Sequence, residues 1–364
     1  MRMKRIIAGM AAALLAAVLF FPCEVSAVSA KSAVLLDSVS GRILYEKNMD
    51  ERSLIASTTK IMTAIVVCEN CNVLDRMAIP NEAVGIEGSS LYLQEGEILT
   101  IQELLYGMML RSGNDAATAL AIYCGGTVEG FAQLMNDKAR KLGMENTHFV
   151  NPHGLDSPDH YSTAHDLAIL AAYAMENPIF RTTVSTKSMK LGQRYLSNHN
   201  KLLWRVEGAD GVKTGYTKAA GRILVSSATR NERRLIAVTI NAPDDWNDHV
   251  VLLESGFRDF RMHTAIECGQ VLDTLEIVGG SQRSVDLVAA EDFAYPLRSN
   301  EEITIQLPTK RFLYAPVTEG DIAGYAYVCL GDAVVGKIPL VYAENVPVEK
   351  LPKKGFWEQL FGVN

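Results

Sequence analysis

The pattern of apolar and polar positions divides the chain into strand-like ends and a helical middle. Near the start, the apolar runs 33–36 and 43–45 flank a turn-like polar segment and predict a β-hairpin. Apolar residues at helical spacing follow, and they predict helices at 57–70, 101–110, 115–123, 128–142 and 164–175. The pattern then returns to strands at 212–217, 223–229 and 234–239, followed by a helix at about 247–260.

Strands at both ends of this region, with helices between them, predict one sheet that both ends complete. The helical part is then an insertion, and we expect a site where the two halves meet. Beyond about His263, short β-rich runs dominate and predict a second, small β-domain. The expected fold class is α+β, with a first domain at 31–262, a β-rich domain at 263–348 and a short amphipathic tail at 349–364.

The first 30 residues have the order of a secretory signal peptide. Basic residues precede an apolar run from 6 to 21, and a small-residue cleavage site ends at Ala27 or Ala30. An uncleaved membrane anchor is the competing interpretation, but the apolar run is somewhat short for a span. We expect segment 1–30 to be removed and the mature protein to be exported to the cell wall or periplasmic side of the cytoplasmic membrane.

Composition narrows the function classes. The chain of 364 residues has a net charge of −7 and no basic stripe, so it lacks the electrostatic footprint of a nucleic-acid-binding protein. An odd number of cysteines after residue 30 argues against a disulfide framework. Cys68-x-x-Cys71 has no second pair at zinc spacing, so we interpret the cysteines as buried or helix-end thiols. They are Cys68, Cys71, Cys124, Cys268 and Cys329.

A serine and a lysine stand three positions apart where the first apolar helical run begins. Ser57 and Lys60 then share one helix face, so the amine can take the proton of the hydroxyl. Lysine does this only when it is neutral, which requires burial or a nearby positive charge to lower its pKa. A helix start also makes the backbone N–H of Ser57 a candidate oxyanion donor. Alone, the spacing is more often a capping serine followed by a surface lysine.

Two further motifs overturn that simpler interpretation. Ser112-Gly113-Asn114 follows a helical segment, and Lys213-Thr214-Gly215 opens a strand-like run. The ordered set resembles the S-x-x-K, S-x-N and K-T-G signature of penicillin-binding proteins and serine β-lactamases. Over about residues 31–260 the chain is similar to the low-molecular-weight serine-type D-Ala-D-Ala carboxypeptidases. The stretches that carry this similarity are 55–63, 104–115, 151–155 and 210–217.

The resemblance implies a fold and a reaction. The fold is the penicillin-binding and serine β-lactamase-like transpeptidase fold, an antiparallel sheet flanked by helices with a helical insert. The reaction is attack by Ser57 on a peptidoglycan stem peptide ending in D-Ala-D-Ala, release of the last D-alanine, and hydrolysis of the acyl-enzyme. β-Lactam antibiotics would acylate Ser57 as substrate mimics. The resemblance implies no cofactor and no metal.

The resemblance also implies roles for the S-x-N motif and for the residue after K-T-G. Ser112 would relay a proton to the leaving D-alanine, next to Lys60 and Lys213. Asn114 would hydrogen-bond substrate or orient Lys60, and the backbone N–H of Tyr216 would be the second oxyanion donor. A plain helix-capping turn explains Ser112 and Asn114 equally well, and both interpretations can hold together.

The K-T-G motif suits a terminal carboxylate. Lys213 offers a cation, which would also lower the pKa of Lys60, and Thr214 offers a hydroxyl. Gly215 lacks a side chain, which would let a peptide lie along the strand as an added strand. Strict alternation sends Lys213 and Thr214 to opposite faces, so both serve the substrate only if the strand is twisted or approached at its edge.

Other functions compete with D,D-carboxypeptidase activity. D,D-endopeptidase activity on cross-links is compatible with the same motifs. A class A β-lactamase needs a deacylating glutamate near an asparagine after the S-x-N motif, and residues 140–170 contain no convincing E-x-x-x-N. A non-catalytic wall-binding or penicillin-sensing protein would not need an intact nucleophile and base.

Three features remain. A histidine cluster at 148–165 includes two aspartates, but its spacings do not reproduce a helical H-E-x-x-H, so we interpret it as a structured loop beside the site. Arg194 and His199 precede the K-T-G strand and are candidates to line the cleft, with no role assigned. In the tail, Phe356, Trp357, Leu360 and Phe361 share one helical face next to lysines, which fits both peripheral membrane contact and a packing helix.

Overall fold

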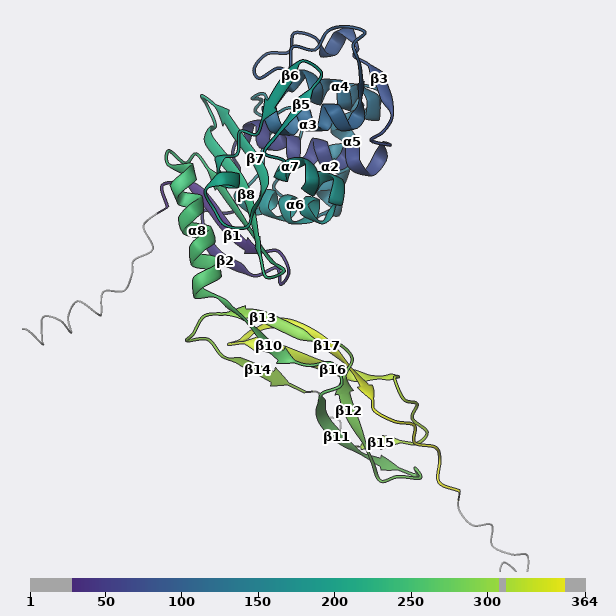
Figure 1. Ribbon diagram of the computed structural model, residues 1–364. Helices are drawn as coiled ribbons and strands as arrows, with labels where there is room; N and C mark the ends of the chain where they lie inside the picture. Colours follow the sequence, from purple (N-terminus) through teal and green to yellow (C-terminus); the bar gives the residue numbers. More distant parts are fainter. Residues whose placement is uncertain (1–27, 308–311, 351–364) are drawn as a thin grey trace, which may run out of the picture. The chain divides into compact units, whose positions relative to one another are not determined.

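The computed structural model describes residues 28–307 and 312–350 (Figure 1). The predicted signal peptide, apart from its last three residues, and nearly all of the predicted tail lie outside the described residues. The chain forms two compact units, Met1–Arg258 and Asp259–Asn364. Among the described helices, none combines the length and the apolar character needed to cross a membrane.

The first unit is built on a five-stranded antiparallel sheet. The hairpin β1 (Ser32–Asp37) and β2 (Ile43–Lys47) joins three consecutive later strands in the order β2-β1-β9-β8-β7. The later strands are β7 (Ala209–Thr217), β8 (Gly221–Arg230) and β9 (Arg233–Ile240). Because β1 pairs with β9, the predicted sheet completed by both ends of the segment is confirmed. Strand β7 lies at the edge.

Both faces of this sheet are covered by helices (Figure 1). All six residues of β1 are buried, which a strand with one solvent face would not show. Helix α8 (Asp245–Asp259) packs on one face, where Gly256 lies against Leu35 and Leu235. The inserted helices, α6 (Ala164–Glu176) foremost, pack on the other face against β1 and β9. The sheet is thus a rigid middle layer, as predicted for the fold class.

The inserted region is mainly helical, as predicted, and polar caps define most helix starts. Thr100 and Glu103 form a reciprocal capping box at the start of α3, and Thr127 and Thr163 cap the starts of α5 and α6. The helices are η1 (Ala56–Thr59), α2 (Lys60–Asn70), η2 (Asn81–Ala83), α3 (Ile101–Arg111), α4 (Asn114–Gly125), α5 (Val128–Lys141), α6, α7 (Pro178–Ser185) and η3 (Lys201–Trp204).

Three details differ from the sequence prediction. The expected helix at 57–70 begins instead as the 3₁₀ turn η1 and becomes α-helical at Lys60. Helix α7 was not predicted, because eight residues are too short for a clear period, although Asn177 at its cap and Pro178 at its first position are start signals. The short pairs β3 (Arg76–Ala78) with β4 (Ile98–Thr100), and β5 (Ser188–Leu191) with β6 (Arg194–Ser197), were also not predicted.

The second unit is β-rich, as the sequence predicted. A six-stranded sheet has the order β14-β16-β17-β12-β11-β15, and β10 pairs with β13. Its core contains Leu287, Val328 and Leu340 among other apolar residues that alternate along the strands. The strands are β10 (Arg261–Ile266), β11 (Val271–Val278), β12 (Ser284–Ala289), β13 (Phe293–Leu297), β14 (Ile303–Gln306), β15 (Phe312–Tyr314), β16 (Ile322–Leu330) and β17 (Ala333–Tyr342).

Candidate active site

Ser57 and Lys60 meet at the junction of η1 and α2. The Lys60 Nζ lies 3.0 Å from the Ser57 Oγ, which is hydrogen-bond distance. The two side chains differ in access, because Ser57 lines a pocket whereas Lys60 is fully buried. A hydroxyl that reaches solvent therefore sits directly above an amine that does not.

The buried amine has two further partners. Lys60 Nζ donates to the Asn114 Oδ1 at 2.6 Å and to the His153 backbone carbonyl at 2.7 Å. Burial holds the pKa of Lys60 well below its usual range, the positive charge of Lys213 lowers it further, and Asp115 opposes both effects. The neutral form of lysine is therefore favoured in this place.

A neutral amine has two N–H donors and one lone pair. Protonated Lys60 donates to the Ser57 Oγ along the 3.0 Å contact. When Lys60 is neutral and gives its two N–H groups to Asn114 and His153, its lone pair is left for the Ser57 hydroxyl, and Ser57 becomes the donor. This arrangement can deprotonate Ser57 as a substrate carbonyl is attacked. The geometry is that of a serine nucleophile with its base.

The segment 151–155 holds this pair in position. An added Cβ on Gly154 would lie 1.8 Å from the Ala56 carbonyl oxygen, and the φ of Gly154 is +88°. Thr63 donates to the Pro152 carbonyl at 2.6 Å, from the next turn of α2. The sequence singled out this segment as a loop beside the site. It did not show that the His153 carbonyl would be a partner of Lys60, because a backbone acceptor leaves no residue-type signal.

The histidines near this segment have partners within the protein. His160 is buried and its Nε2 lies 2.8 Å from the Thr59 Oγ1, while its Nδ1 accepts from the Val150 N–H. Burial lowers the pKa of His160 to about 4, so that ring is neutral. These contacts fit the interpretation as a structured loop.

A second serine and lysine pair joins the helical region to the sheet. Ser112 caps the end of α3 with φ +63°, and Lys213 comes from the edge strand β7. Lys213 Nζ donates to the Ser112 Oγ at 3.1 Å and to the Thr214 carbonyl at 2.8 Å. Burial lowers the pKa of Lys213 to about 7. The three predicted motifs therefore converge, although Ser112 bonds to Lys213 rather than to Lys60.

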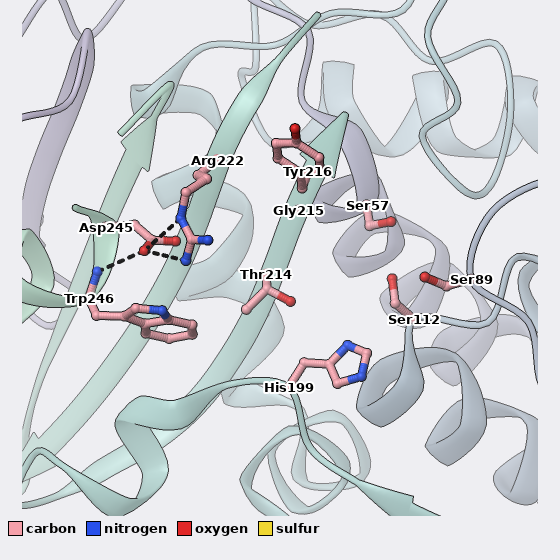
Figure 2. Close-up of a pocket in the computed structure, with 10 residues that line it drawn as sticks. All are labelled: Ser57, Ser89, Ser112, His199, Thr214, Gly215, Tyr216, Arg222, Asp245 and Trp246. Carbon is pink, nitrogen blue, oxygen red and sulfur yellow. Dashed lines mark hydrogen bonds and ion pairs between the residues drawn. The ribbon is translucent and has the colours of Figure 1, made fainter. Parts of the chain in front are cut away.

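A pocket of about 240 Å³ opens over these pairs (Figure 2). Thr214 lies in its middle, with Ser57 and Ser112 on one side and Trp246 on the other. Its walls are formed by Ser57, Ser89, Ser112, His199, Thr214, Gly215, Tyr216, Arg222, Asp245 and Trp246. The side chains of Lys213 and Thr214 therefore point to opposite faces of β7, as strand alternation predicts. Lys213 is buried beside Ser112, whereas Thr214 faces the pocket.

Gly215 makes a close contact within the protein that the sequence did not predict. An added Cβ would lie 3.2 Å from the Ile55 carbonyl oxygen and 3.3 Å from the Ser57 backbone nitrogen. The missing side chain therefore lets the Ser57 turn approach β7, and Gly215 also forms part of the pocket wall, where a substrate would lie. The close approach also brings the Ser57 N–H near the strand that carries Tyr216, whose side chain is exposed.

Both the oxygen and the nitrogen of the Asn114 side-chain amide form hydrogen bonds within the protein. Its Oδ1 accepts from Lys60, its Nδ2 donates to the Glu87 carbonyl at 2.5 Å, and its backbone N–H donates to the Ser89 carbonyl at 2.7 Å. Of the two roles that the resemblance implied, this geometry favours orientation of Lys60. It also fixes the loop that carries Ser89 to the pocket, which sequence reasoning did not find.

The far wall of the pocket was also not predicted. Arg222 from β8 forms an ion pair with the buried Asp245 at 2.7 Å, and its guanidinium lies 6.0 Å from the Trp246 ring. His199 stands on the near side, where burial, Lys213 and Arg111 lower its pKa to about 4. These residues lie outside any short motif, so only the fold brings them to the pocket. Arg194 lies elsewhere, paired with Glu97.

Comparison with known proteins agrees with the geometry. The family model described as D-alanyl-D-alanine carboxypeptidase matches residues 21–244. This chain belongs to the D-alanyl-D-alanine carboxypeptidase family. A second family model, the C-terminal domain of penicillin-binding protein 5, matches residues 260–348 in the β-rich unit. The family prediction made from the three motifs is confirmed, and the protein is a serine-type peptidase.

Similar proteins span nearly the whole chain. D-alanyl-D-alanine carboxypeptidase DacC of Escherichia coli K12 is 34% identical over 342 residues, 89% of this chain and 86% of that protein. DacF of Bacillus subtilis 168 is 32% identical over 333 residues, 87% of this chain and 86% of that protein. The structure of penicillin-binding protein 5 from Haemophilus influenzae has a TM-score of 0.76 at 31% identity, covering 88% of this chain and 98% of that one. The fold class is thereby confirmed.

Proposed function

We propose that this member of the D-alanyl-D-alanine carboxypeptidase family removes the terminal D-alanine from peptidoglycan stem pentapeptides through an acyl-enzyme on Ser57. One observation carries the proposal: the Ser57 Oγ opens to a pocket and lies 3.0 Å from the Nζ of a fully buried lysine. Burial makes Lys60 a base at neutral pH, and the pocket gives a substrate carbonyl access to the hydroxyl.

In the first step, the Ser57 oxygen attacks the carbonyl carbon of the D-Ala-D-Ala peptide bond while its proton passes to Lys60. The carbonyl oxygen becomes an oxyanion, and the backbone N–H groups of Ser57 and Tyr216 are the proposed donors to it. The closeness of Gly215 to the Ser57 nitrogen supports this pairing of donors. Loss of one such donor typically costs about a hundred- to a thousandfold in rate.

Collapse of the tetrahedral intermediate needs a proton on the leaving nitrogen. Ser112 lines the pocket and accepts from Lys213, so it can pass a proton to the D-alanine amine and recover one from Lys213. Lys60 then gives the proton that it took from Ser57 to this pair, so that Lys60 is neutral again and Lys213 is charged again. Water then attacks the acyl carbon, and Lys60 is again the proposed base. The second step releases the shortened stem peptide and restores Ser57.

Lys213 and Thr214 are the proposed partners of the terminal carboxylate. The Thr214 hydroxyl faces the pocket, and Lys213, buried behind Ser112, keeps one ammonium proton beyond those given to Ser112 and the Thr214 carbonyl. A carboxylate placed there positions the scissile bond over Ser57. β-Lactam antibiotics carry a carboxylate and a reactive carbonyl in one molecule, so we propose that they acylate Ser57 by the same contacts.

We also propose that the enzyme acts outside the cytoplasmic membrane, after loss of segment 1–30. The order of basic, apolar and small residues in that segment supports export. The apolar face of the tail at 349–364, next to its lysines, supports a peripheral membrane contact. N-terminal sequencing of the exported protein tests the first statement. Vesicle co-sedimentation with and without residues 349–364 tests the second.

The function is tested by incubating the mature protein with diacetyl-Lys-D-Ala-D-Ala and measuring free D-alanine. We expect steady release by the wild type, a penicillin adduct on Ser57, and neither from Ser57→Ala. Unchanged release by Ser57→Ala would refute the assignment. Analysis of products from cross-linked muropeptides separates carboxypeptidase from endopeptidase activity, and a long-lived penicilloyl-enzyme excludes β-lactamase as the main activity.

A further inference from the structure

Arg194 contacts a loop of the active site from outside the pocket. It lies on β6, and its guanidinium forms an ion pair with Glu97, with two nitrogen–oxygen distances of 2.6 and 2.7 Å. Its Nε donates to the Leu91 carbonyl at 2.9 Å. Both partners belong to segment 87–97, which we call the 87–97 loop. Arg194 therefore ties this loop to the β5–β6 hairpin, about a hundred residues away in the sequence.

The other end of the 87–97 loop lies against Asn114. The Asn114 Nδ2 donates to the Glu87 carbonyl at 2.5 Å, and the Asn114 backbone N–H donates to the Ser89 carbonyl at 2.7 Å. Between these two residues, Gly88 has φ +93°, and an added Cβ on it would lie 2.8 Å from the Asn114 Nδ2. Ser89 also lines the pocket (Figure 2). The loop is thus in direct contact with the amide that orients Lys60.

The Glu87 carbonyl determines which way the Asn114 amide points. A carbonyl oxygen only accepts, so it binds the amide nitrogen and turns the Oδ1 toward Lys60, from which it accepts at 2.6 Å. If the amide turned over, its N–H would face the lone pair of neutral Lys60 and donate to it. That lone pair would then no longer be available for the Ser57 proton. The place of one backbone carbonyl therefore decides whether Lys60 can act as a base.

Asp115 holds the middle of the loop from the inside. Its buried carboxylate accepts from the Ser90 Oγ at 2.6 Å. It also accepts from the backbone N–H groups of Leu91 and Leu93, at 2.8 and 3.2 Å. The Leu91 side chain lies against Gly113, where an added Cβ would be 3.0 Å from the Leu91 Cγ. The loop is therefore held by α4 on one side and by β6 on the other.

Tyr92 shows that the loop backbone is held in an unfavourable conformation. Its φ is +59°, a left-handed value that a bulky residue rarely adopts, and its side chain is 83% exposed, so packing of the ring does not explain that value. The restraint comes from hydrogen bonds: the Tyr92 N–H donates to the Ser90 Oγ at 2.9 Å, and the Arg194 Nη2 donates to the Tyr92 carbonyl at 3.3 Å. Such strain persists only where the surroundings fix it. Without Arg194, relief of this strain would favour a rearranged loop.

We propose that Arg194 is a positioning residue for the reaction. It holds the 87–97 loop against α4, so that the Glu87 carbonyl keeps the Oδ1 of Asn114 on Lys60. The inference rests on the proposed function, because it gives Arg194 an effect on the base of that reaction. Arg194 acts through the loop and through Asn114.

Arg230 is a matched control in the same unit. Its guanidinium pairs with Glu254 through two nitrogen–oxygen contacts, and its Nε donates to the Glu207 carbonyl at 3.0 Å. The Arg230 side chain is 20% exposed, against 27% for Arg194. Arg230 is the last residue of β8, whereas Arg222, near the start of that strand, lines the pocket. Its substitution removes the same kinds of contact and leaves those of the 87–97 loop in place.

The kinetic test compares Arg194→Gln with Arg230→Gln in the mature protein. Penicillin acylation and D-alanine release by Arg194→Gln should fall about ten- to a hundredfold, since a catalytic group displaced by about 1 Å can cost that much. Glu97→Gln breaks the same ion pair from the side of the loop and should lower both rates as well. Arg230→Gln should stay within about twofold of the wild type, and thermal unfolding shows that each variant is folded. Equal rates for Arg194→Gln and Arg230→Gln would overturn the proposal.

A double-mutant cycle shows whether the effect passes through Asn114. In Asn114→Ala the amide is already absent, so adding Arg194→Gln should lower the remaining acylation rate by less than about threefold. A role of Arg194 in general stability alone would make the two losses multiply. Multiplied losses would therefore show that Arg194 does not act through Asn114.

Hydrogen exchange supplies a measurement that needs no activity. The backbone N–H groups of Leu91, Leu93 and Asn114 all bond within this arrangement, so they should exchange at least about tenfold faster in Arg194→Gln than in Arg230→Gln. Equal exchange in the two variants would contradict the proposed tie. Absence of D-alanine release by the wild type would instead refute the proposed function, and the acylation and exchange comparisons would still decide the role of Arg194.

Discussion

The site contains two serine and lysine pairs that look alike and differ in their surroundings. The Nζ–Oγ distance is 3.0 Å between Lys60 and Ser57 and 3.1 Å between Lys213 and Ser112, and both lysines are buried. The first pair stands at the start of a helix and the second joins a helix end to an edge strand. Distance alone therefore does not assign a role to either lysine.

The partners of each amine make the difference. Lys60 has two acceptors besides the serine, and the nearby charge of Lys213 adds to burial in lowering its pKa. Lys213 has one acceptor besides the serine, and burial lowers its pKa to about 7, so much of it is charged at neutral pH. The same residue type is thus a base in one place and a cation in the other. The following predictions test that contrast, from the largest effect to the smallest.

Lys60→Met should abolish most of the activity. The substitution removes the base but keeps the volume of the side chain, so acylation by penicillin and D-alanine release should fall by about 10³- to 10⁴-fold. Rapid-mixing measurement of acylation provides the number, and thermal unfolding confirms that the variant is folded. A loss no greater than that of Lys213→Met would contradict the division of roles.

Asn114→Asp should move the pH profile of the Lys60 pair alone. A carboxylate in place of the amide oxygen stabilises protonated Lys60 and raises its pKa by about 1–3 units. Because the base must be neutral, the acid limb of kcat/KM should move to higher pH by the same interval, and the rate at a fixed pH on that limb should fall about ten- to a thousandfold. The pH profile measures this directly. Asn114→Ala is the control, since it removes the hydrogen bond without adding charge. If the pH profiles of Asn114→Asp and the wild type superimpose, Asn114 does not control the pKa of Lys60.

Lys213→Met should weaken carboxylate recognition more than acylation chemistry. Loss of a charge-assisted contact should lower kcat/KM about ten- to a hundredfold for a peptide with a free terminal carboxylate. A peptide amide of the same sequence lacks the carboxylate, so its already low kcat/KM should fall by a smaller factor, the part due to the proton relay through Ser112. An unaltered kcat/KM for the free acid would remove the proposed role of Lys213.

Lys213→Arg should change the pH dependence with the smallest loss of rate. Lys213 is charged below its pKa of about 7 and loses that charge as the pH rises, so carboxylate use by the wild type should decline on the alkaline side. A guanidinium stays charged throughout this range, so the decline should disappear while kcat/KM at pH 6 stays within about tenfold. Persistence of the same alkaline decline in Lys213→Arg would assign it to another group.

The fold illustrates where sequence patterns are informative. Long periodic segments were predicted within a few residues, for example α5 at 128–141 against a prediction of 128–142. Helix α7 and the β5–β6 hairpin were not predicted, because each is too short to build a period and depends on packing. The turn η1 was predicted as α-helix, since nothing in four residues distinguishes a 3₁₀ turn from the start of a helix.

For this protein, residue identity and spacing by themselves determined the family, the sheet built from both ends of its domain, and the three motifs that the site unites. Motifs identify the family because acyl transfer needs particular side chains, and the helix and strand periods predict which elements carry those side chains. Only the tertiary structure decided that the His153 carbonyl and Asn114 orient Lys60, that Gly215 admits the Ser57 turn, and that Trp246 closes the pocket. Those contacts involve backbone atoms or residues far apart in the sequence, so they form only in the folded protein.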